Sequence, residues 1–170
     1  MKEIIYNYDD VSDNEVNRIV RRSKALIVND KEEIMFAVMN NNYFLIGGHV
    51  DSDESDYDCL KREIKEEIGL DIDIEPVKPF LRIKYLNKNY PSEGVNTMSV
   101  ANYYVIRKNL TPDMSKVNLT SDEVKGDFHT VNINILDAIN TLVSSIDTCS
   151  KACPVLDTIE AVKEYINISN

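Results

Sequence analysis

The residues most able to do chemistry are three glutamates, Glu63, Glu66 and Glu67. Their spacing is i, i+3 and i+4, and an α-helix turns by roughly 100° per residue, so a helix would bring all three carboxylates within about 100° of its surface. Like charges at this spacing destabilise a helix by about 0.2–0.5 kcal/mol per pair. A cluster of hard oxygen ligands is what Mg²⁺, Mn²⁺ or Ca²⁺ requires, so the spacing indicates a divalent-metal site.

The segment around these glutamates, residues 48–70, has a specific pattern: Gly, five residues, Glu, seven residues, then Arg-Glu-apolar-any-Glu-Glu-any-Gly-apolar. The fixed positions are filled by Gly48, Glu54, Arg62, Glu63, Ile64, Glu66, Glu67, Gly69 and Leu70. This pattern resembles the signature of the Nudix hydrolase family, the MutT-like proteins, at all nine positions, which chance rarely produces. The resemblance implies a Nudix-type α/β/α sandwich around a mixed β-sheet, with residues 48–70 as a loop-helix-loop catalytic box.

The resemblance also implies roles for the acidic residues of the box. Glu63 and Glu67 would be direct metal ligands, and Glu66 would be a third ligand or would help to activate water. The backbone carbonyl of Gly47, next to the box, would be the main-chain ligand. The expected cofactor is Mg²⁺ or Mn²⁺, since such ions take carboxylates together with substrate phosphates.

Further residues would position or assist these carboxylates. Arg62 is expected to orient them by ion pairing without touching the substrate, and Glu54 to brace the loop against the helix. Many members of the family carry one more acid in a late loop, as base or extra ligand. Glu123 is the candidate for this catalytic role, with Asp122 and Asp127 as competitors, and a solvated acidic loop is the alternative.

The implied activity is that of an enzyme, a pyrophosphohydrolase acting on acid anhydrides. It would cleave a pyrophosphate bond in a nucleoside diphosphate linked to another moiety, with water attacking phosphorus and metal ions stabilising the developing charge. The alternative is a catalytically silent Nudix domain that binds a nucleotide as a sensor or regulator. Such domains commonly lose box acids, and this chain retains them all. Isopentenyl-diphosphate isomerase chemistry uses the same fold but needs another metal arrangement and a catalytic cysteine.

Composition limits the classes of partner. The net charge of -10 argues against a nucleic-acid polymer, which is bound largely through Lys and Arg. No run of 18 apolar residues indicates a membrane span, and the N-terminus turns acidic within ten residues, unlike a signal peptide. We therefore expect a single domain over residues 1–170, a cytoplasmic location and a small nucleotide-type diphosphate as substrate. The resemblance leaves a homodimer open.

Residues outside the box must select the substrate, and the sequence does not name it. Aromatic side chains able to stack on a base are Tyr43, Phe44, Tyr85, Tyr103 and Tyr104, with core packing as the alternative for each. Basic side chains able to meet phosphates are Arg82, Lys84 and Arg107, with plain solvent exposure as the alternative.

Hydrophobic patterning predicts the elements that position the box. Residues 23–29 and 33–40 are expected to form a β-hairpin, followed by a short strand over 43–46. The box helix should begin near Ser55 or Asp56, end at Gly69, and bury a stripe that includes Leu60, Ile64 and Ile68. Further strands are predicted over 72–77, 79–86, 97–107 and 128–134, and helices over 136–146 and 155–168, with a short helix around 14–20.

Overall fold

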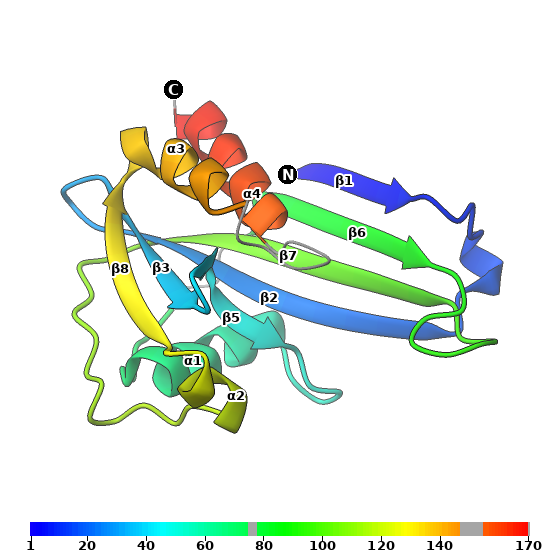
Figure 1. Ribbon diagram of the computed structural model, residues 1–170, viewed down its shortest axis with the longest axis horizontal. Coiled ribbons are helices and arrows are strands. Elements are labelled where there is room, and N and C mark those ends of the chain that lie inside the picture. The colour runs from blue at the N-terminus through cyan, green and yellow to red at the C-terminus, as the bar shows by residue number, and fades with distance from the viewer. Residues whose placement is uncertain (75–77, 147–154, 170) are drawn as a thin grey trace.

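The computed structural model describes residues 1–74, 78–146 and 155–169, and within them eight strands form one mixed sheet with helices on both faces (Figure 1). The strands are β1 (Lys2–Asn7), β2 (Arg18–Val28), β3 (Glu33–Met39), β4 (Asn42–Phe44), β5 (Ile46–His49), β6 (Leu81–Asn87), β7 (Thr97–Arg107) and β8 (His129–Asn134). The helices are α1 (Asp56–Ile68), α2 (Ser121–Lys125), α3 (Ile135–Ser145) and α4 (Val155–Ser169), with a 3₁₀ turn η1 at Asp13–Glu15. The expected mixed α/β class is confirmed.

Strand β2 lies at the centre of the sheet. It pairs in parallel with β7 along its whole length, from Arg18 opposite Thr97 to Val28 opposite Arg107. On its other edge it pairs antiparallel with β5 over residues 22–25 and with β3 over residues 27–28. In the part of the chain that the structure describes, β5 pairs with no strand other than β2. The backbone groups on the outer edge of β5 therefore point away from the sheet.

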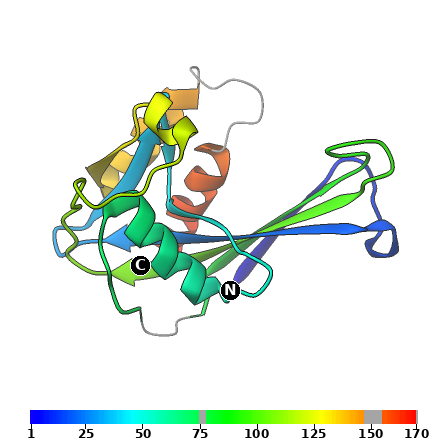
Figure 2. The ribbon, with the colours of Figure 1, turned by 90° about the horizontal axis from the view of Figure 1, so that it is seen from below.

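The two faces of the sheet carry separate hydrophobic clusters. Helix α1 packs against the face that includes Ala25 and Ile46, whereas α3 and α4 pack against the face that includes Leu26 and Phe36. Ala25 and Leu26 are consecutive, so their opposite directions follow from the alternation of side chains along a strand. Beyond the helices, β1, β2, β6 and β7 continue as a narrow twisted ribbon (Figure 2).

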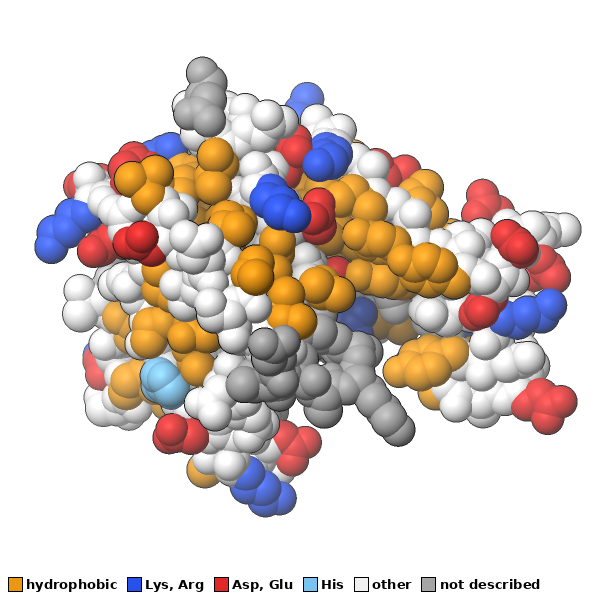
Figure 3. All heavy atoms as spheres, turned by 45° about the horizontal axis from the view of Figure 1, so that its top comes forward, with side chains coloured by type: hydrophobic (Ala, Val, Ile, Leu, Met, Phe, Trp, Pro, Cys, Tyr) orange, Lys and Arg blue, Asp and Glu red, His pale blue; other side chains and the backbone are white. Residues whose placement is uncertain are grey.

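The face with α3, α4 and β1 exposes several large hydrophobic side chains among charged ones (Figure 3). Leu136 on α3 and Tyr8, just after β1, are 84% and 83% exposed. This surface lies on the opposite side of the sheet from α1, so it is separate from the glutamates of the box.

Helix α1 has the ends and the buried face that the sequence predicts. Ser55 is the N-cap and accepts a hydrogen bond from the backbone N–H of Asp58. Gly69 ends the helix with φ of 72°, a conformation that favours glycine, and its N–H donates to the carbonyl of Lys65. The stripe of Leu60, Ile64 and Ile68 is fully buried against the sheet.

The first residue of α1, Asp56, joins the helix to two strands. Its carboxylate accepts hydrogen bonds from Tyr104 Oη at 2.6 Å and Asn102 Nδ2 at 2.7 Å, and pairs with Arg21 Nη2 at 2.5 Å. Its backbone carbonyl accepts from Ser23 Oγ at 3.0 Å. Burial alone would raise the pKa of Asp56, but the three side-chain donors outweigh it and hold that pKa below its ordinary value. Tertiary polar contacts thus fix the N-terminal end of α1, while the apolar stripe fixes the rest.

The helices and strands predicted from the sequence are mostly confirmed, but the prediction for the N-terminal region is wrong. The predicted strand over 97–107 coincides with β7, and the two C-terminal helices match α3 and α4 within one residue. The helix expected around residues 14–20 is absent there: η1 covers only Asp13–Glu15, and residues 18–20 belong to β2. β1 was not expected either; it gains parallel pairing with β6, a long-range interaction that local polarity does not show. Residues 72–74 of the strand predicted over 72–77 are not strand, and residues 75–77 lie outside the described residues.

We expect Asp56→Ala to lower the free energy of unfolding by about 1–3 kcal/mol, because it removes the shared acceptor of Tyr104 and Asn102. Because folding lowers the pKa of Asp56, this stabilisation is present at neutral pH and is lost as the pH falls through the folded-state pKa. Urea unfolding at neutral pH measures the loss. Asp73→Ala is the control, since that side chain is fully exposed and should matter little. Wild-type stability in Asp56→Ala would contradict the role given to Asp56.

Candidate functional site

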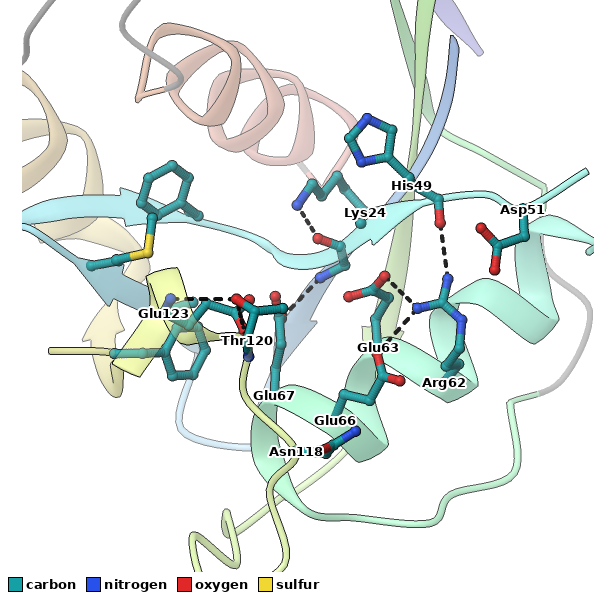
Figure 4. A pocket seen from close by; sticks show the side chains of 16 residues that line it. Lys24, His49, Asp51, Arg62, Glu63, Glu66, Glu67, Asn118, Thr120 and Glu123 are labelled. Atoms are coloured by element: carbon teal, nitrogen blue, oxygen red, sulfur yellow. Dashed lines mark hydrogen bonds and ion pairs between the residues drawn. The ribbon is translucent and has the colours of Figure 1, made fainter. Parts of the chain in front are cut away.

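A cavity of about 390 Å³ lies between α1, the outer edge of β5 and the segment that leads into α2. Figure 4 shows the box carboxylates projecting from α1 toward β5 inside it. Its polar lining consists of Lys24, His49, Asp51, Arg62, Glu63, Glu66, Glu67, Asn118, Thr120 and Glu123, with Gly47 and Gly48 at the strand. Its apolar lining consists of Ala37, Met39, Phe44 and Phe128. The residues predicted from the sequence as metal ligands or catalytic groups therefore border one space: Gly47, Arg62, Glu63, Glu66, Glu67 and Glu123.

Glu67 is the most buried of the box carboxylates, with 8% of the residue exposed. Its Oε2 accepts a hydrogen bond from the backbone N–H of Gly47 at 3.1 Å. Burial raises the pKa of Glu67 to about 8, and the positive charge of Lys24 opposes this shift while Glu63 adds to it. A carboxyl group in this state binds a proton at neutral pH unless a cation takes the place of that proton.

The carboxyl group of Glu63 lies directly against the backbone of Gly48. A Cβ atom on Gly48 would be 2.2 Å from Glu63 Oε1. Burial raises the pKa of Glu63, opposed first by Arg62 and then by Lys24. The glycine at this box position thus allows the carboxyl group to approach the strand backbone, and a side chain there would displace it.

Arg62 connects the acidic loop to the box carboxylates. Its guanidinium donates to both oxygens of Glu54 at 2.9 Å each, and its Nη1 donates to Glu63 Oε1 at 2.7 Å and Glu66 Oε2 at 3.1 Å. Nη2 also donates to the carbonyl of His49 at 2.9 Å. The hydrogen bonds that Arg62 donates to Glu54 and Glu63 raise its pKa beyond the ordinary value, so the guanidinium stays charged. A planar fork with five donors suits this arrangement, which a lysine would not reproduce.

Lys24 brings a second cation to the carboxylates from the opposite side. Its Nζ donates a hydrogen bond to the backbone carbonyl of Gly47, the predicted main-chain ligand. Figure 4 shows this ammonium at the Gly47 carbonyl, with the box glutamates on the other side of β5. Gly47 therefore uses its N–H for Glu67 and its carbonyl for Lys24.

Glu123 lines the cavity from α2, near enough to Glu67 to raise the pKa of that carboxyl. Its carboxylate accepts from the backbone N–H of Thr120 at 2.6 Å and from the Thr120 hydroxyl at 2.9 Å, so it belongs to a capping box. Asp122 and Asp127 are outside the cavity lining, and the Asp127 side chain is fully exposed. Of the three acids weighed for the late loop, Glu123 alone borders the cavity.

Most of the proposed substrate contacts lie elsewhere. Of the aromatic residues, Phe44 lines the cavity. Tyr103 is buried in the hydrophobic cluster on the α3 and α4 face of the sheet, and Tyr43 packs against that cluster. Tyr104 donates a hydrogen bond to Asp56, and Tyr85 donates one to Asp157. The basic residues form ion pairs away from the cavity: Arg82 and Lys84 with Glu3, and Arg107 with Glu32.

Sequence reasoning missed Lys24 and α2. Lys24 is a basic residue that directly precedes the apolar run over residues 25–28, and a charge next to a buried run is a signal that its side chain has an internal acceptor. The T-x-x-E spacing of Thr120 and Glu123 is a capping-box signature and would have predicted the start of α2.

The donor atoms fit a divalent metal, although the side chains are not arranged around one. Across residues 1–74, 78–146 and 155–169, no group of three or more His, Cys, Asp or Glu side chains is arranged to hold a metal ion. The donors are hard oxygens: the carboxylates of Glu63 and Glu67 and the carbonyl of Gly47. A cation, Lys24, already lies at that carbonyl, so the position attracts positive charge.

The raised pKa of Glu67 predicts how the stability of the metal-free protein depends on pH. Below about pH 4.5, its ordinary value, Glu67 is protonated in both the folded and the unfolded states. As the pH rises toward about 8, the unfolded state loses this proton first, so stability is lost across that window. Glu67→Gln, which cannot ionise, should gain stability relative to the wild type between about pH 5 and about pH 8. Urea unfolding with a chelator measures both proteins, and parallel pH profiles would contradict the assignment.

Residues 16–132 match the family model described as the NUDIX domain. No curated protein is significantly similar in sequence to the chain. A MutT protein from Methanosarcina mazei Go1 has a similar structure, with a TM-score of 0.54 and 13% identity over 90% of this chain and 96% of that chain. The ORF135 protein of E. coli gives a TM-score of 0.55 and 14% identity over 94% and 96%. At these identities the likeness shows the fold alone. Among the described residues, no helix is long and apolar enough to cross a membrane.

Proposed function

This chain belongs to the Nudix family, whose members are generally hydrolases, and we propose that it is a metal-dependent hydrolase of a nucleotide-type pyrophosphate. It would cleave a pyrophosphate bond in a nucleoside diphosphate linked to another moiety. The observation that carries the proposal is the complete set of box carboxylates on α1, facing the backbone of Gly47 across one cavity.

The proposed metal is Mg²⁺ or Mn²⁺, held by Glu63, Glu67 and the carbonyl of Gly47, with Glu66 as a further ligand. When bound, such an ion neutralises charge on phosphate oxygens and lowers the pKa of a coordinated water. Glu66 is the most exposed of the three carboxylates, so it is the one best placed to meet solvent water.

The other polar residues would prepare the site. Arg62 binds one carboxylate oxygen of Glu63 and one of Glu66. The second oxygen of each carboxylate does not bind Arg62 and would be the one to contact a metal ion. This supports a positioning role for Arg62, as does its bond to both oxygens of Glu54. Glu123 is the proposed proton acceptor for water, and its place in the cavity near Glu67 supports this role.

The apolar wall of the cavity supports a nucleotide-type substrate. Phe44 and Phe128, with Met39, border the same space as the carboxylates. Aromatic and thioether side chains pack well against flat rings, whereas the carboxylate side suits a metal-bound diphosphate. The apolar side of the lining thus matches the nucleoside, and the carboxylate side matches the metal-bound diphosphate.

The isomerase alternative is weakened by Cys59, the cysteine of the box. Cys59 is fully buried, and burial raises the pKa of its thiol to about 12, so it is not a ready nucleophile. Cys149 and Cys153 lie outside the described residues.

The proposal treats residues 1–170 as one domain. Helix α4 lies beyond the matched residues, yet Val162 and Tyr165 belong to the same hydrophobic cluster as sheet residues such as Leu26. β1, which precedes the matched residues, pairs with β6 over six residues. These contacts support the single-domain assignment.

We expect Mg²⁺- or Mn²⁺-dependent hydrolysis of at least one member of a panel of ADP-ribose, coenzyme A, diadenosine polyphosphates and oxidised nucleoside triphosphates. Mass spectrometry of the products identifies the bond that is cleaved. Glu67→Gln should reduce turnover by orders of magnitude while keeping the fold, because it removes a charged ligand. Glu160→Gln, on α4 and paired with Lys163, is the matched control and should keep full turnover.

One result would argue against hydrolase activity, and another would argue against the assigned site. Tight nucleotide binding without turnover under any metal condition would favour the silent sensor over the enzyme. Near-normal turnover in Glu67→Gln would contradict the assigned site even if the chain is a hydrolase.

A further inference from the structure

Lys24 reaches the box from a strand that carries no part of the signature. It lies in β2 directly opposite Gly47 in the antiparallel pair with β5. Side chains at opposite positions in such a pair point to the same face, about 4.5–5.5 Å apart at Cβ. Gly47 has no side chain, so the stem of Lys24 crosses above it and Nζ binds its carbonyl. Figure 4 shows the ammonium beyond the strand, at the rim of the cavity.

The ammonium lies within electrostatic reach of two carboxylates as well as the carbonyl. Its charge lowers the pKa of Glu67 and, after Arg62, that of Glu63. One cation thus interacts with the three groups to which we assign the metal: Gly47, Glu63 and Glu67.

Arg62 has a different relation to these groups. It contacts Glu63 and Glu66 through one oxygen each and is held in place by Glu54 and by the carbonyl of His49. None of its hydrogen bonds uses the Gly47 carbonyl or Glu67 among the described contacts. A metal ion can therefore bind beside Arg62, but the carbonyl that Lys24 occupies has to be released.

We propose that Lys24 is an internal counter-cation, which takes the metal position at Gly47 in the metal-free protein and leaves that carbonyl when a divalent ion binds. This inference rests on the metal site of the proposed function. It adds a residue outside the box that sets metal affinity. In the metal-free protein it also offsets the negative charge of Glu63 and Glu67 where these are ionised, since a buried charge without a partner is strongly destabilising.

The test measures Mn²⁺ binding by isothermal titration calorimetry, at one mildly alkaline pH and without substrate. Lys24→Met keeps a stem of similar length but has no charge, so Mn²⁺ should bind about tenfold more tightly than to the wild type. Lys24→Arg keeps the competing cation and should show no such gain. Lys84→Met removes the same charge from β6, where Lys84 pairs with Glu3, and controls for the change in net charge.

A second measurement separates this role from a purely structural one. In chelator, Lys24→Met should unfold at lower urea concentration than the wild type, because Glu63 and Glu67 lose their internal cation. Saturating Mn²⁺ should raise its midpoint by more than it raises that of the wild type, since binding energy adds to stability. If Lys24→Met lost only packing, its urea midpoint would fall by the same amount in chelator and in saturating Mn²⁺.

Each outcome decides between the proposals. Equal Mn²⁺ affinity in the wild type and Lys24→Met, with binding measurable in both, would overturn the counter-cation role and leave the hydrolase proposal standing. A similar gain in Lys84→Met would also overturn it, since the effect would then be one of net charge. Absence of Mn²⁺ binding in every protein would overturn both this inference and the proposed metal site.

Discussion

The hydrogen bond from the Gly47 N–H to the buried carboxylate of Glu67 joins α1 to the outer edge of β5, and the site is arranged around it. This contact exists because β5 has no strand on its outer edge within the described residues, so its backbone groups need other partners. It also exists because α1 is held close, by its apolar stripe and by Asp56 at its first turn. Gly48 then permits Glu63 to approach the same edge.

Charge balance is the second constraint. Three carboxylates on one helix face repel one another, and in this chain two cations of different origin offset them. Arg62 comes from α1 itself and stays within a network of fixed hydrogen bonds, whereas Lys24 comes from β2 and binds a single carbonyl. A cation held by many hydrogen bonds, such as Arg62, is suited to holding the carboxylates in place. A cation held by one hydrogen bond, such as Lys24, is more easily replaced by a metal ion.

The sequence predicted what is local and left out what is long-range. The ends and buried face of α1 follow from capping residues and helical spacing, and both are encoded within residues 55–69. Asp56 looked like an alternative cap, but its partners Asn102 and Tyr104 are on β7, which spacing along the chain cannot show. Lys24 was missed for the same reason, because its acceptor is set by the register of β2 with β5. The roles given to Glu63, Glu66, Glu67, Arg62 and Glu123 stay predictions, although the fold brings them to one cavity.

The register of β2 has a further consequence for assembly of the protein. Ser23 and Lys24 are neighbours that point to opposite faces: one donates to the backbone of α1 at Asp56, the other to Gly47. A slip of one residue would reverse every side chain of the strand and take both the Ser23 hydroxyl and the Lys24 ammonium away from these acceptors. One strand alignment therefore makes both contacts, and a misaligned sheet would lose a hydrogen bond to the helix together with one of the two cations that offset the carboxylates.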